Sequence, residues 1–251
     1  KSLYSTNGGV TWTSGGALPA GMSGATVSVA YGFTTATSGR WVAISSTGAS
    51  CYSVNGGISW VAGGALPAAT YSCMTYGQGC WVALSTGDTI NAYSTDGGVT
   101  WTAGTALPTS TTWVSIAYGA NKFVAVSSDG AVDPAYSVDG GLNWSNTGET
   151  GYLGTGTITD VRYGQGVFVV TTSSSNNMSS SEDGINWTTR AITRASGTGA
   201  LIAVNGNPNQ SSIWAIIPSA STTAASSAIL GSTAKARAFI VDSKLIAVRV
   251  T

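Results

Sequence analysis

Carboxylates are the side chains here that could do hydrolytic chemistry, and the sequence has few of them. It contains ten acidic residues, of which only Glu149 and Glu182 are glutamates, and no histidine. Glycoside hydrolysis needs two carboxylates that flank the scissile bond. Glu149 lies in a Gly/Thr-rich stretch with no acidic neighbour, and Glu182 lies inside a predicted turn. Without histidine, Ser–His and Cys–His nucleophile–base pairs are excluded. We therefore expect a protein that is not an enzyme.

The sequence also gives little support for a metal site, a cofactor site or nucleic-acid binding. The three cysteines, Cys51, Cys73 and Cys80, show no Cys-x-x-Cys or Cys/His spacing of a zinc site. They are predicted to be free thiols that pack as small residues between strands. Charged residues make up 8% of the chain and the formal net charge is zero. Because binding to nucleic acid or an anionic membrane needs a basic patch, both are argued against. No cofactor or metal is predicted.

Short polar side chains and a few aromatic rings remain as candidate ligand-binding groups. Asp and Asn side chains in variable loops could hydrogen-bond sugar hydroxyls, and rings near the loops could stack on sugars. The alternative is that Asp and Asn serve the loops themselves and that the rings pack between strands. The candidates are Asp88, Asn91, Asp129, Asp133, Asn176 and Asn177, with Tyr71, Trp113 and Tyr152.

The elements that would position these loops are set by a repeated nine-residue phrase, Tyr-Ser-Thr-Asp-Gly-Gly-Val-Thr-Trp at Tyr93–Trp101. The Asp or Asn can accept hydrogen bonds from its own turn, and the glycines supply φ > 0. Each copy is predicted to be a β-hairpin turn that the Trp covers, with the Trp largely buried between the turn and the neighbouring blade. The five copies carry the pairs Asn7 and Trp12, Asn55 and Trp60, Asp96 and Trp101, Asp139 and Trp144, and Asp183 and Trp187.

The copies recur at the length of a four-stranded propeller blade. Their Trp residues are spaced by 48, 41, 43 and 43 residues. Each period also contains a strand that ends in Gly, such as Val114–Gly119, and an apolar strand, such as Phe123–Val126. No long helix is predicted.

The ends of the chain predict how the domain closes. The chain begins with the third and fourth strands of a blade and ends with the first and second, Ala238–Val241 and Leu245–Val248. We therefore predict one all-β domain over 1–251, a six-bladed β-propeller closed by pairing the N-terminal strands with the C-terminal strands. The segment 222–230 replaces the turn motif in one degenerate blade. The predicted blades are approximately 236–251 plus 1–13, 27–62, 72–104, 113–147, 158–190 and 199–232.

The phrase resembles the Asp-box, or BNR repeat, of sialidase-like β-propellers. Ser94, Asp96, Gly98, Thr100 and Trp101 match its Ser-x-Asp-x-Gly-x-Thr-Trp pattern position for position. That family includes sialidases and other glycosidases, photosystem assembly factors, and phage tail or fibre proteins. Its sialidases use three arginines, a Tyr–Glu pair and an Asp acid/base. Those sets cannot be placed here, because the arginines fall at unlike repeat positions: 40, 162, 190, 194, 237 and 249.

Taken together, these patterns indicate a non-enzymatic surface propeller of a phage tail or fibre, or of an extracellular appendage, that mediates attachment. The expected partner is a cell-surface glycan or a neighbouring virion or appendage protein, and a homo-oligomer is an option. The alternatives are a sialidase-like glycoside hydrolase and a purely structural virion or assembly subunit. The expected location is extracellular or on a virion surface. Because the chain begins at Lys1, we expect a processed or excised piece.

Overall fold

The structure is a computed structural model of the 251-residue chain. It describes residues 1–22, 26–35, 37–149, 156–173 and 177–191, together with the strand backbones 201–205, 214–218, 237–241 and 244–248. The described residues form strands and turns and contain no helix, as predicted. Accordingly, no helix among them could cross a membrane.

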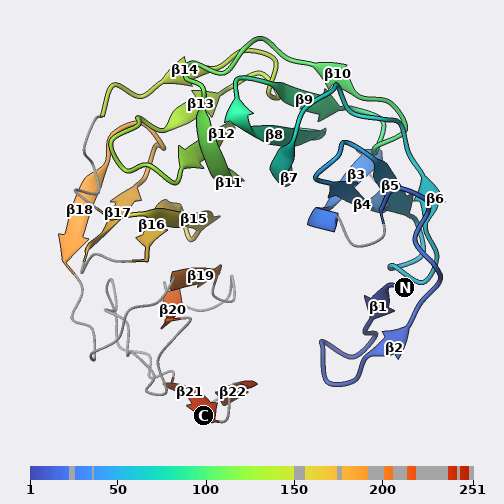
Figure 1. The fold of residues 1–251 in the computed structure, drawn as a ribbon. Coiled ribbons are helices and arrows are strands. Elements are labelled where there is room, and N and C mark those ends of the chain that lie inside the picture. Colours follow the sequence, from blue (N-terminus) through green and yellow to red (C-terminus); the bar gives the residue numbers. More distant parts are fainter. Residues whose placement is uncertain are drawn as a thin grey trace. The chain divides into compact units, whose positions relative to one another are not determined.

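Four runs of four consecutive strands make up most of the described chain (Figure 1). We call them the first to fourth repeats. The first repeat is β3 (Thr26–Thr35), β4 (Ser38–Ser45), β5 (Ser50–Ser53) and β6 (Val61–Ala62). The second is β7 (Tyr71–Gly77), β8 (Cys80–Asp88), β9 (Asn91–Ser94) and β10 (Thr102–Ala103). The third is β11 (Thr111–Gly119), β12 (Lys122–Ser127), β13 (Ala135–Ser137) and β14 (Ser145–Asn146). The fourth is β15 (Ile158–Gly164), β16 (Val167–Thr172), β17 (Asn177–Ser181) and β18 (Thr188–Ala191).

Strands within the first and fourth repeats pair in sequence order, as an antiparallel meander. The second and third repeats are joined into one eight-stranded sheet, because β8 runs on to Asp88 and pairs with the start of β11. In that junction Thr111 faces Asp88 and Thr112 faces Thr86, with a register shift between the two pairs. The junction was not predicted from the sequence, because the repeat phrase does not include it.

The chain divides into two compact units, each with its own core. The first unit comprises Lys1–Trp113, Asn121–Phe123 and Ser137–Ser145, and the second comprises Val114–Ala120, Val124–Tyr136 and Asn146–Thr251. Apolar residues of the inner strands fill both cores because these strands are covered on two faces. The first core includes Val42, Ile44, Tyr71, Met74, Trp81, Ala83 and Ala92. The second includes Ala117, Val124, Val126, Ile158, Val161, Phe168 and Val170.

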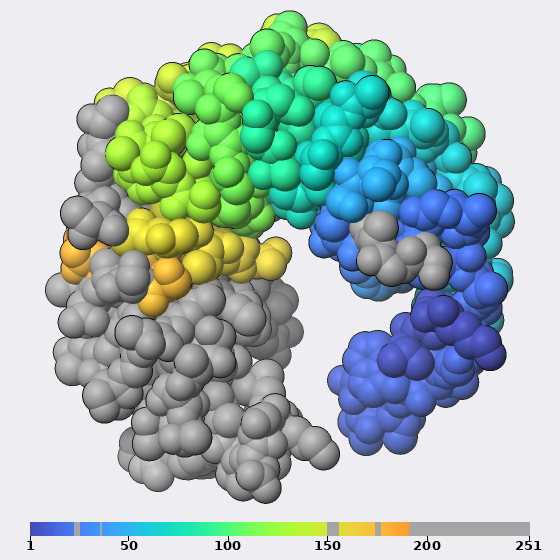
Figure 2. All heavy atoms as spheres, in the orientation of Figure 1, coloured from blue at the N-terminus to red at the C-terminus, as the bar shows by residue number. Residues whose placement is uncertain are grey.

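Neighbouring repeats of the first unit pack through their first strands. Strands β3 and β7 lie side by side (Figures 1 and 2). The Ser28 hydroxyl links them, since Oγ donates to the Met74 carbonyl and accepts from the Met74 N–H, both at 3.2 Å. A side chain therefore satisfies backbone groups that strand pairing leaves open at this edge.

The two ends of the chain form separate hairpins. Strands β1 (Leu3–Tyr4) and β2 (Thr13–Ser14) pair with each other, as do β21 (Arg237–Val241) and β22 (Lys244–Val248). Strands β19 (Leu201–Asn205) and β20 (Trp214–Pro218) form a third two-stranded sheet. The predicted pairing of the N-terminal with the C-terminal strands is not among the pairs of the described strands. The degenerate turn segment 222–230 lies outside the described residues.

The five repeat Trp residues are less buried than predicted. Trp144 is 9% exposed, whereas Trp12 is 62% exposed and the other three are half-buried. The prediction that all five are largely buried is wrong for Trp12. Its hairpin consists of two two-residue strands and offers little surface to cover an indole.

The cysteines pack as predicted in two of three positions. Cys51 and Cys73 are buried, Cys80 is half-buried, and none of the three forms a disulfide. Burial raises the pKa of the Cys51 thiol to about 11, so it remains protonated near neutral pH.

Candidate functional site

The Asp-box carboxylates build their own turns. Asp96 Oδ1 accepts from Ser94 Oγ and from the Thr100 N–H, both at 2.9 Å, and Oδ2 accepts from Thr100 Oγ1 at 2.5 Å. Ser94 Oγ in turn accepts from the Gly98 N–H at 2.9 Å. Asp139 and Asp183 accept equivalent bonds. These carboxylates are occupied within their turns and are structural groups.

Hydrogen bonding also sets the protonation of these carboxylates. For Asp96, burial by itself would raise the pKa, but hydrogen bonds from Thr100, Ser94 and Val99 outweigh it and lower the pKa below its ordinary value. The pKa values of Asp139 and Asp183 are lowered for the same reason. All three turns are therefore held by charged carboxylates at neutral pH.

The Asp-box turn at Asp96 is fastened to the first repeat. The Gly98 carbonyl accepts from the Gly64 N–H at 3.0 Å and from Ser50 Oγ at 3.3 Å, while Trp101 Nε1 donates to Ser50 Oγ at 3.2 Å. Arg40 Nη1 donates to the Asp96 and Gly97 carbonyls at 3.1 and 3.2 Å. The turn between the first and second strands of one repeat therefore contacts the Asp-box of the next.

Two predicted ligand-binding aspartates serve their own loops. Asp88 Oδ1 accepts from Ser85 Oγ and from the Ile90 N–H, the latter at 2.8 Å. Asp129 Oδ1 accepts from the Ala131 N–H at 2.9 Å. Both bonds close a tight turn, which is a common reason for Asp in loops. Asp88 and Asp129 therefore have a structural role in their loops, and their predicted ligand binding stays a prediction.

The remaining polar candidates differ in exposure. Asn91 is buried, and its Nδ2 donates to the Thr105 carbonyl at 2.5 Å while its Oδ1 has no partner. Asp133 is half-buried with an unpartnered Oδ1, and Asn177 is half-buried in β17. Asn176 and Tyr152 lie outside the described residues. Those described belong to three different repeats and both units.

The predicted stacking rings are in the core. Tyr71 and Trp113 are 1% and 0% exposed, and their polar atoms donate to the Pro67 and Thr109 carbonyls. Burial, aided by the Asp88 charge, raises the pKa of Tyr71 far above its ordinary value. Because neither ring offers a face to solvent, we propose no sugar stacking for them.

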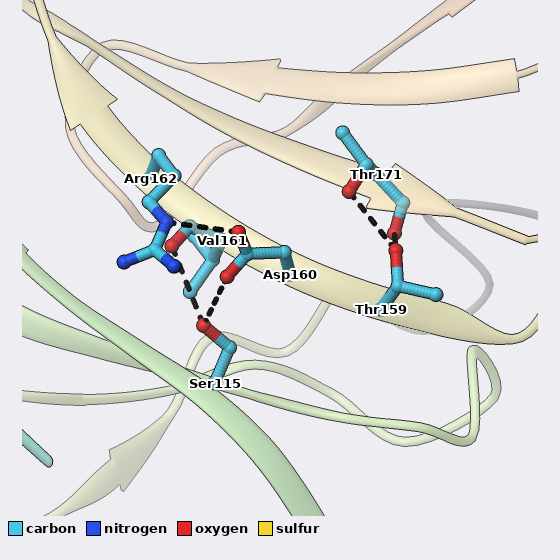
Figure 3. A network of polar contacts seen from close by, with 6 residues as sticks. All are labelled: Ser115, Thr159, Asp160, Val161, Arg162 and Thr171. Atoms are coloured by element: carbon cyan, nitrogen blue, oxygen red, sulfur yellow. Dashed lines mark hydrogen bonds and ion pairs between the residues drawn. The ribbon is translucent and has the colours of Figure 1, made fainter. Parts of the chain in front are cut away.

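An ion pair on β15 is the group that sequence reasoning missed (Figure 3). Arg162 Nε lies 2.8 Å from Asp160 Oδ2, and Ser115 Oγ of β11 donates to Asp160 Oδ1 at 2.6 Å. The Asp160 side chain is 10% exposed and that of Arg162 is 52% exposed. Figure 3 shows the terminal guanidinium nitrogens of Arg162 pointing away from Asp160. It is the one ion pair among the described residues.

Strand register explains how these two side chains meet. A register shift between Ile158 and Asp160 marks a β-bulge, after which Asp160 and Arg162 lie two residues apart and therefore on one face of β15. Thr159, at the bulge, hydrogen-bonds Thr171 across the hairpin at 3.1–3.2 Å (Figure 3). Pairing with Val169 fixes Arg162 in register.

Repeat comparison shows that the fold does not require this pair. The first two repeats have Ala30 and Thr75 at the position of Arg162, since these residues pair with Val42 and Val82 as Arg162 pairs with Val169. At the position of Asp160 they have Ser28 and Cys73. The pair could have been found in the sequence, because the fourth repeat has two opposite charges, Asp160 and Arg162, at positions where the first two repeats have small uncharged residues.

The chemistry that this pair offers is hydrogen bonding through the Arg162 guanidinium. Asp160 is neutralised by Arg162, and no second carboxylate contacts it among the described residues. No group of metal-ligating side chains gathers in the described part of the chain. What the pair presents to solvent is a fixed, planar guanidinium with four terminal N–H donors.

Comparison with known proteins supports the fold class. The BNR/Asp-box repeat family matches residues 92–103, the second-repeat copy of the motif. A search of curated proteins found no significant sequence match. Among solved structures, YCF48 from Cyanidioschyzon merolae is 17% identical, with a TM-score of 0.53, over 77% of this chain and 72% of YCF48.

Two further solved structures are similar. YCF48 bound to D1 peptide is 14% identical over 77% of this chain and 60% of that protein, with a TM-score of 0.53. Virginiamycin B lyase from Staphylococcus aureus is 13% identical over 72% of this chain and 59% of the lyase, with a TM-score of 0.54. The chain therefore spans less than two thirds of the length of these two. At such identities the likeness shows the fold alone. The chain is an all-β protein of propeller-like fold that carries BNR/Asp-box repeats.

Proposed function

We propose that this chain is a non-enzymatic binding module and that Arg162 binds a carboxylate of a protein partner. The observation that carries the proposal is the Asp160–Arg162 pair, with Asp160 buried and bonded to Ser115 and the guanidinium half exposed. A planar guanidinium held through Nε can bind a carboxylate through its terminal N–H groups in a two-bond geometry.

The neutral surroundings make such a contact selective. The chain has zero formal net charge, so it does not attract anions as a whole. Asp160 fixes the direction of the guanidinium and offsets its charge, which favours a ligand that matches its hydrogen-bond geometry over any nearby anion.

Support for a protein partner comes from two sides. YCF48, which has a similar fold, has been solved with a D1 peptide bound. In addition, five of the groups predicted to bind sugars are engaged in their own turns or buried: Asp88, Asp129, Asn91, Tyr71 and Trp113. A glycan partner is therefore the second choice.

The proposed role is attachment: the module would hold a partner protein on an appendage or virion surface, outside the cell. A catalytic role is not proposed, because Glu182 lies in an Asp-box turn beside the structural Asp183, Glu149 has no acidic neighbour in the sequence, and the chain has no histidine. A purely structural subunit is the alternative that binding experiments would leave standing.

A peptide array with matched C-termini tests the proposal. Twelve-residue peptides would be printed with a free C-terminal carboxylate or the corresponding amide, and with or without Asp and Glu. We expect binding to carboxylate-bearing peptides that falls at least tenfold in R162Q. The control is R190Q, because Arg190 is exposed and its Nε bonds Ser180 Oγ at 3.1 Å on β18 of the same repeat.

Four results would overturn the proposal. Equal binding of the peptides with a C-terminal carboxylate and those with a C-terminal amide would show that the carboxylate is not the group that is bound. An equal loss of binding in R162Q and R190Q would indicate a nonspecific charge effect. Binding to a glycan array, with none to peptides, would favour the sugar alternative. Turnover of a glycoside by the same sample would restore the enzyme alternative.

We further propose that the domain closes as a six-bladed propeller, with β21–β22 covering the outer face of the first repeat. That face exposes Val29, Tyr31, Phe33 and Trp41 at 51%, 45%, 46% and 37%. The corresponding residues of the second repeat, Met74 and Trp81, are 6% and 0% exposed. An apolar face of this kind indicates that a partner surface is needed.

The sequence pattern of the C-terminal hairpin, β21–β22, suits it to cover this apolar face. Its apolar strands pair with Val241 opposite Lys244, in the register in which Gly77 pairs with Cys80 in the second repeat.

The fluorescence of Trp41 in the full chain tests this closure. Comparing acrylamide quenching in wild type and in W41F isolates the contribution of Trp41. Closure predicts a shielded Trp41, and quenching as fast as that of free tryptophan would exclude it. Removing residues 1–14 should open the sheet and cause aggregation.

A further inference from the structure

Two of the five Asp-box turns contain asparagine followed by glycine. Asn7–Gly8 and Asn55–Gly56 stand where the other turns have Asp96–Gly97, Asp139–Gly140 and Asp183–Gly184. Gly8 and Gly56 have φ of 70° and 74°, and an added Cβ at either would meet nothing within 4 Å. Both asparagines are exposed to solvent.

The asparagines copy the carboxylate geometry atom by atom. Asn7 Oδ1 accepts from Ser5 Oγ and from the Thr11 N–H, both at 2.9 Å, as Asp96 Oδ1 does from Ser94 and Thr100. The chemical difference is at the second oxygen position, where Asn7 Nδ2 donates to Thr11 Oγ1 at 2.8 Å. In the aspartate turn the hydroxyl of Thr100 donates instead. Since a hydroxyl both donates and accepts, the turn accepts either side chain.

We propose that Asn7 is a deamidation site and that its conversion to aspartate completes an Asp-box. The Gly8 amide nitrogen attacks Asn7 Cγ, the Cγ–Nδ2 bond breaks, and ammonia leaves with the proton from the Gly8 nitrogen. The product is a five-membered succinimide. Water then adds to one ring carbonyl and opens the ring to aspartate or isoaspartate. Glycine favours the attack because it has no side chain to obstruct its nitrogen.

The turn decides which product is retained. Aspartate can accept the same bonds from Ser5 and Thr11 that Asp96 accepts from Ser94 and Thr100. Isoaspartate lengthens the backbone by one carbon, so its carboxylate cannot reach those donors in register. Isoaspartate can return to the succinimide, whereas aspartate is held by the turn. The aspartate fraction should therefore rise with time.

Packing predicts that Asn7 reacts faster than Asn55. The side chain must leave its hydrogen bonds before Gly8 can attack, so the rate follows the opening of the turn. The Asn7 turn exposes Val10 and Trp12 at 79% and 62%. The Asn55 turn is fastened from outside, because the Gly57 carbonyl accepts from Ser2 Oγ at 2.9 Å and the Ile58 carbonyl accepts from the Gly16 N–H at 2.7 Å.

Peptide mapping of the aged, full-length protein tests this inference. The tryptic peptide from Ser2 to Arg40 contains Asn7 as its only amide side chain. After incubation at 37 °C and mildly alkaline pH, it should gain about 1 Da, as expected for conversion of a labile Asn to Asp. The Asn55 site should gain this mass several-fold more slowly. Cleavage by an Asp-specific protease separates aspartate from isoaspartate, with N7D as the standard.

The outcomes are separable from any binding role. Conversion of Asn55 at a rate equal to or above that of Asn7 would overturn the packing argument. An Asn7 that stays amidated while the denatured chain converts would overturn the site itself. An isoaspartate fraction that only grows would show that the turn does not retain the product.

Discussion

The aromatic ring of Tyr76 in β7 packs directly against the backbone of Gly32 in β3. A Cβ placed on Gly32 would lie 2.2 Å from the Tyr76 ring, and the Tyr76 hydroxyl donates to the Phe33 carbonyl at 2.9 Å. Gly119 and Tyr163 repeat the relationship in the second unit, where the distance is 2.0 Å. Glycine is required at these places for space, because the next repeat lays an aromatic ring on its backbone.

Substituting Gly32→Ala should therefore destabilise the first unit through overpacking. We expect a loss of about 1–3 kcal/mol in the free energy of unfolding, the usual range for an extra methyl group in a tight contact. Urea denaturation measures it. In a Y76A background the same substitution should cost much less, and an equal cost in both backgrounds would show that the ring is not the obstacle.

The loss of stability on replacing a repeat Trp with Ala should increase with the burial of its indole. Trp144→Ala should cost about 3–5 kcal/mol, since the indole is buried and its Nε1 donates to the Gly141 carbonyl at 3.1 Å. Trp12→Ala is the matched control, because the same bond to Gly9 is made at 3.0 Å by an exposed ring. Its cost should stay below about 1 kcal/mol. Equal melting temperatures for the two variants would contradict this order.

Acid should weaken the aspartate turns. The pKa of Asp96 is lowered in the folded chain, so its contribution to stability is present above its unfolded pKa and is lost as pH falls through the folded value. Thermal melting at pH 7 and near pH 2 should show this loss, and D96N should show less of it. Asn55 already lacks a titrating group, so N55S should leave the pH dependence unchanged. A pH dependence of D96N identical to wild type would refute the assignment.

Loop closure by Asp88 predicts a stability effect for Asp88→Ala. The substitution removes the acceptor for the Ser85 hydroxyl and the Ile90 N–H, at a cost of about 1 kcal/mol. Faster hydrogen exchange at the Ile90 amide would locate the effect. Asp88→Asn keeps an acceptor and should restore most of the protection. If only ligand binding changed, the original prediction of a ligand-binding role would stand.

Local pattern determined much of the architecture. The Ser-x-Asp-x-Gly-x-Thr-Trp phrase predicted the turns, because its hydrogen bonds run between residues two to four positions apart, such as Ser94, Asp96 and Thr100. Alternating apolar residues and glycines at the turns predicted the strands, and the described residues contain no helix. Such features are decided within a few residues and can be read from them.

Tertiary packing decided the rest, because exposure and pairing depend on residues far away in the sequence. Trp12 and Trp144 share a motif, yet one is exposed and the other is buried by its neighbours. Tyr71 and Trp113 were candidates for a ligand and are core residues. Asp160 and Arg162 carried no motif, and only the bulge in β15 and the hydroxyl of Ser115, 45 residues away, make them a fixed pair. A repeat sequence specifies its frame, whereas the site arises where one repeat departs from the others and its neighbours hold that departure in place.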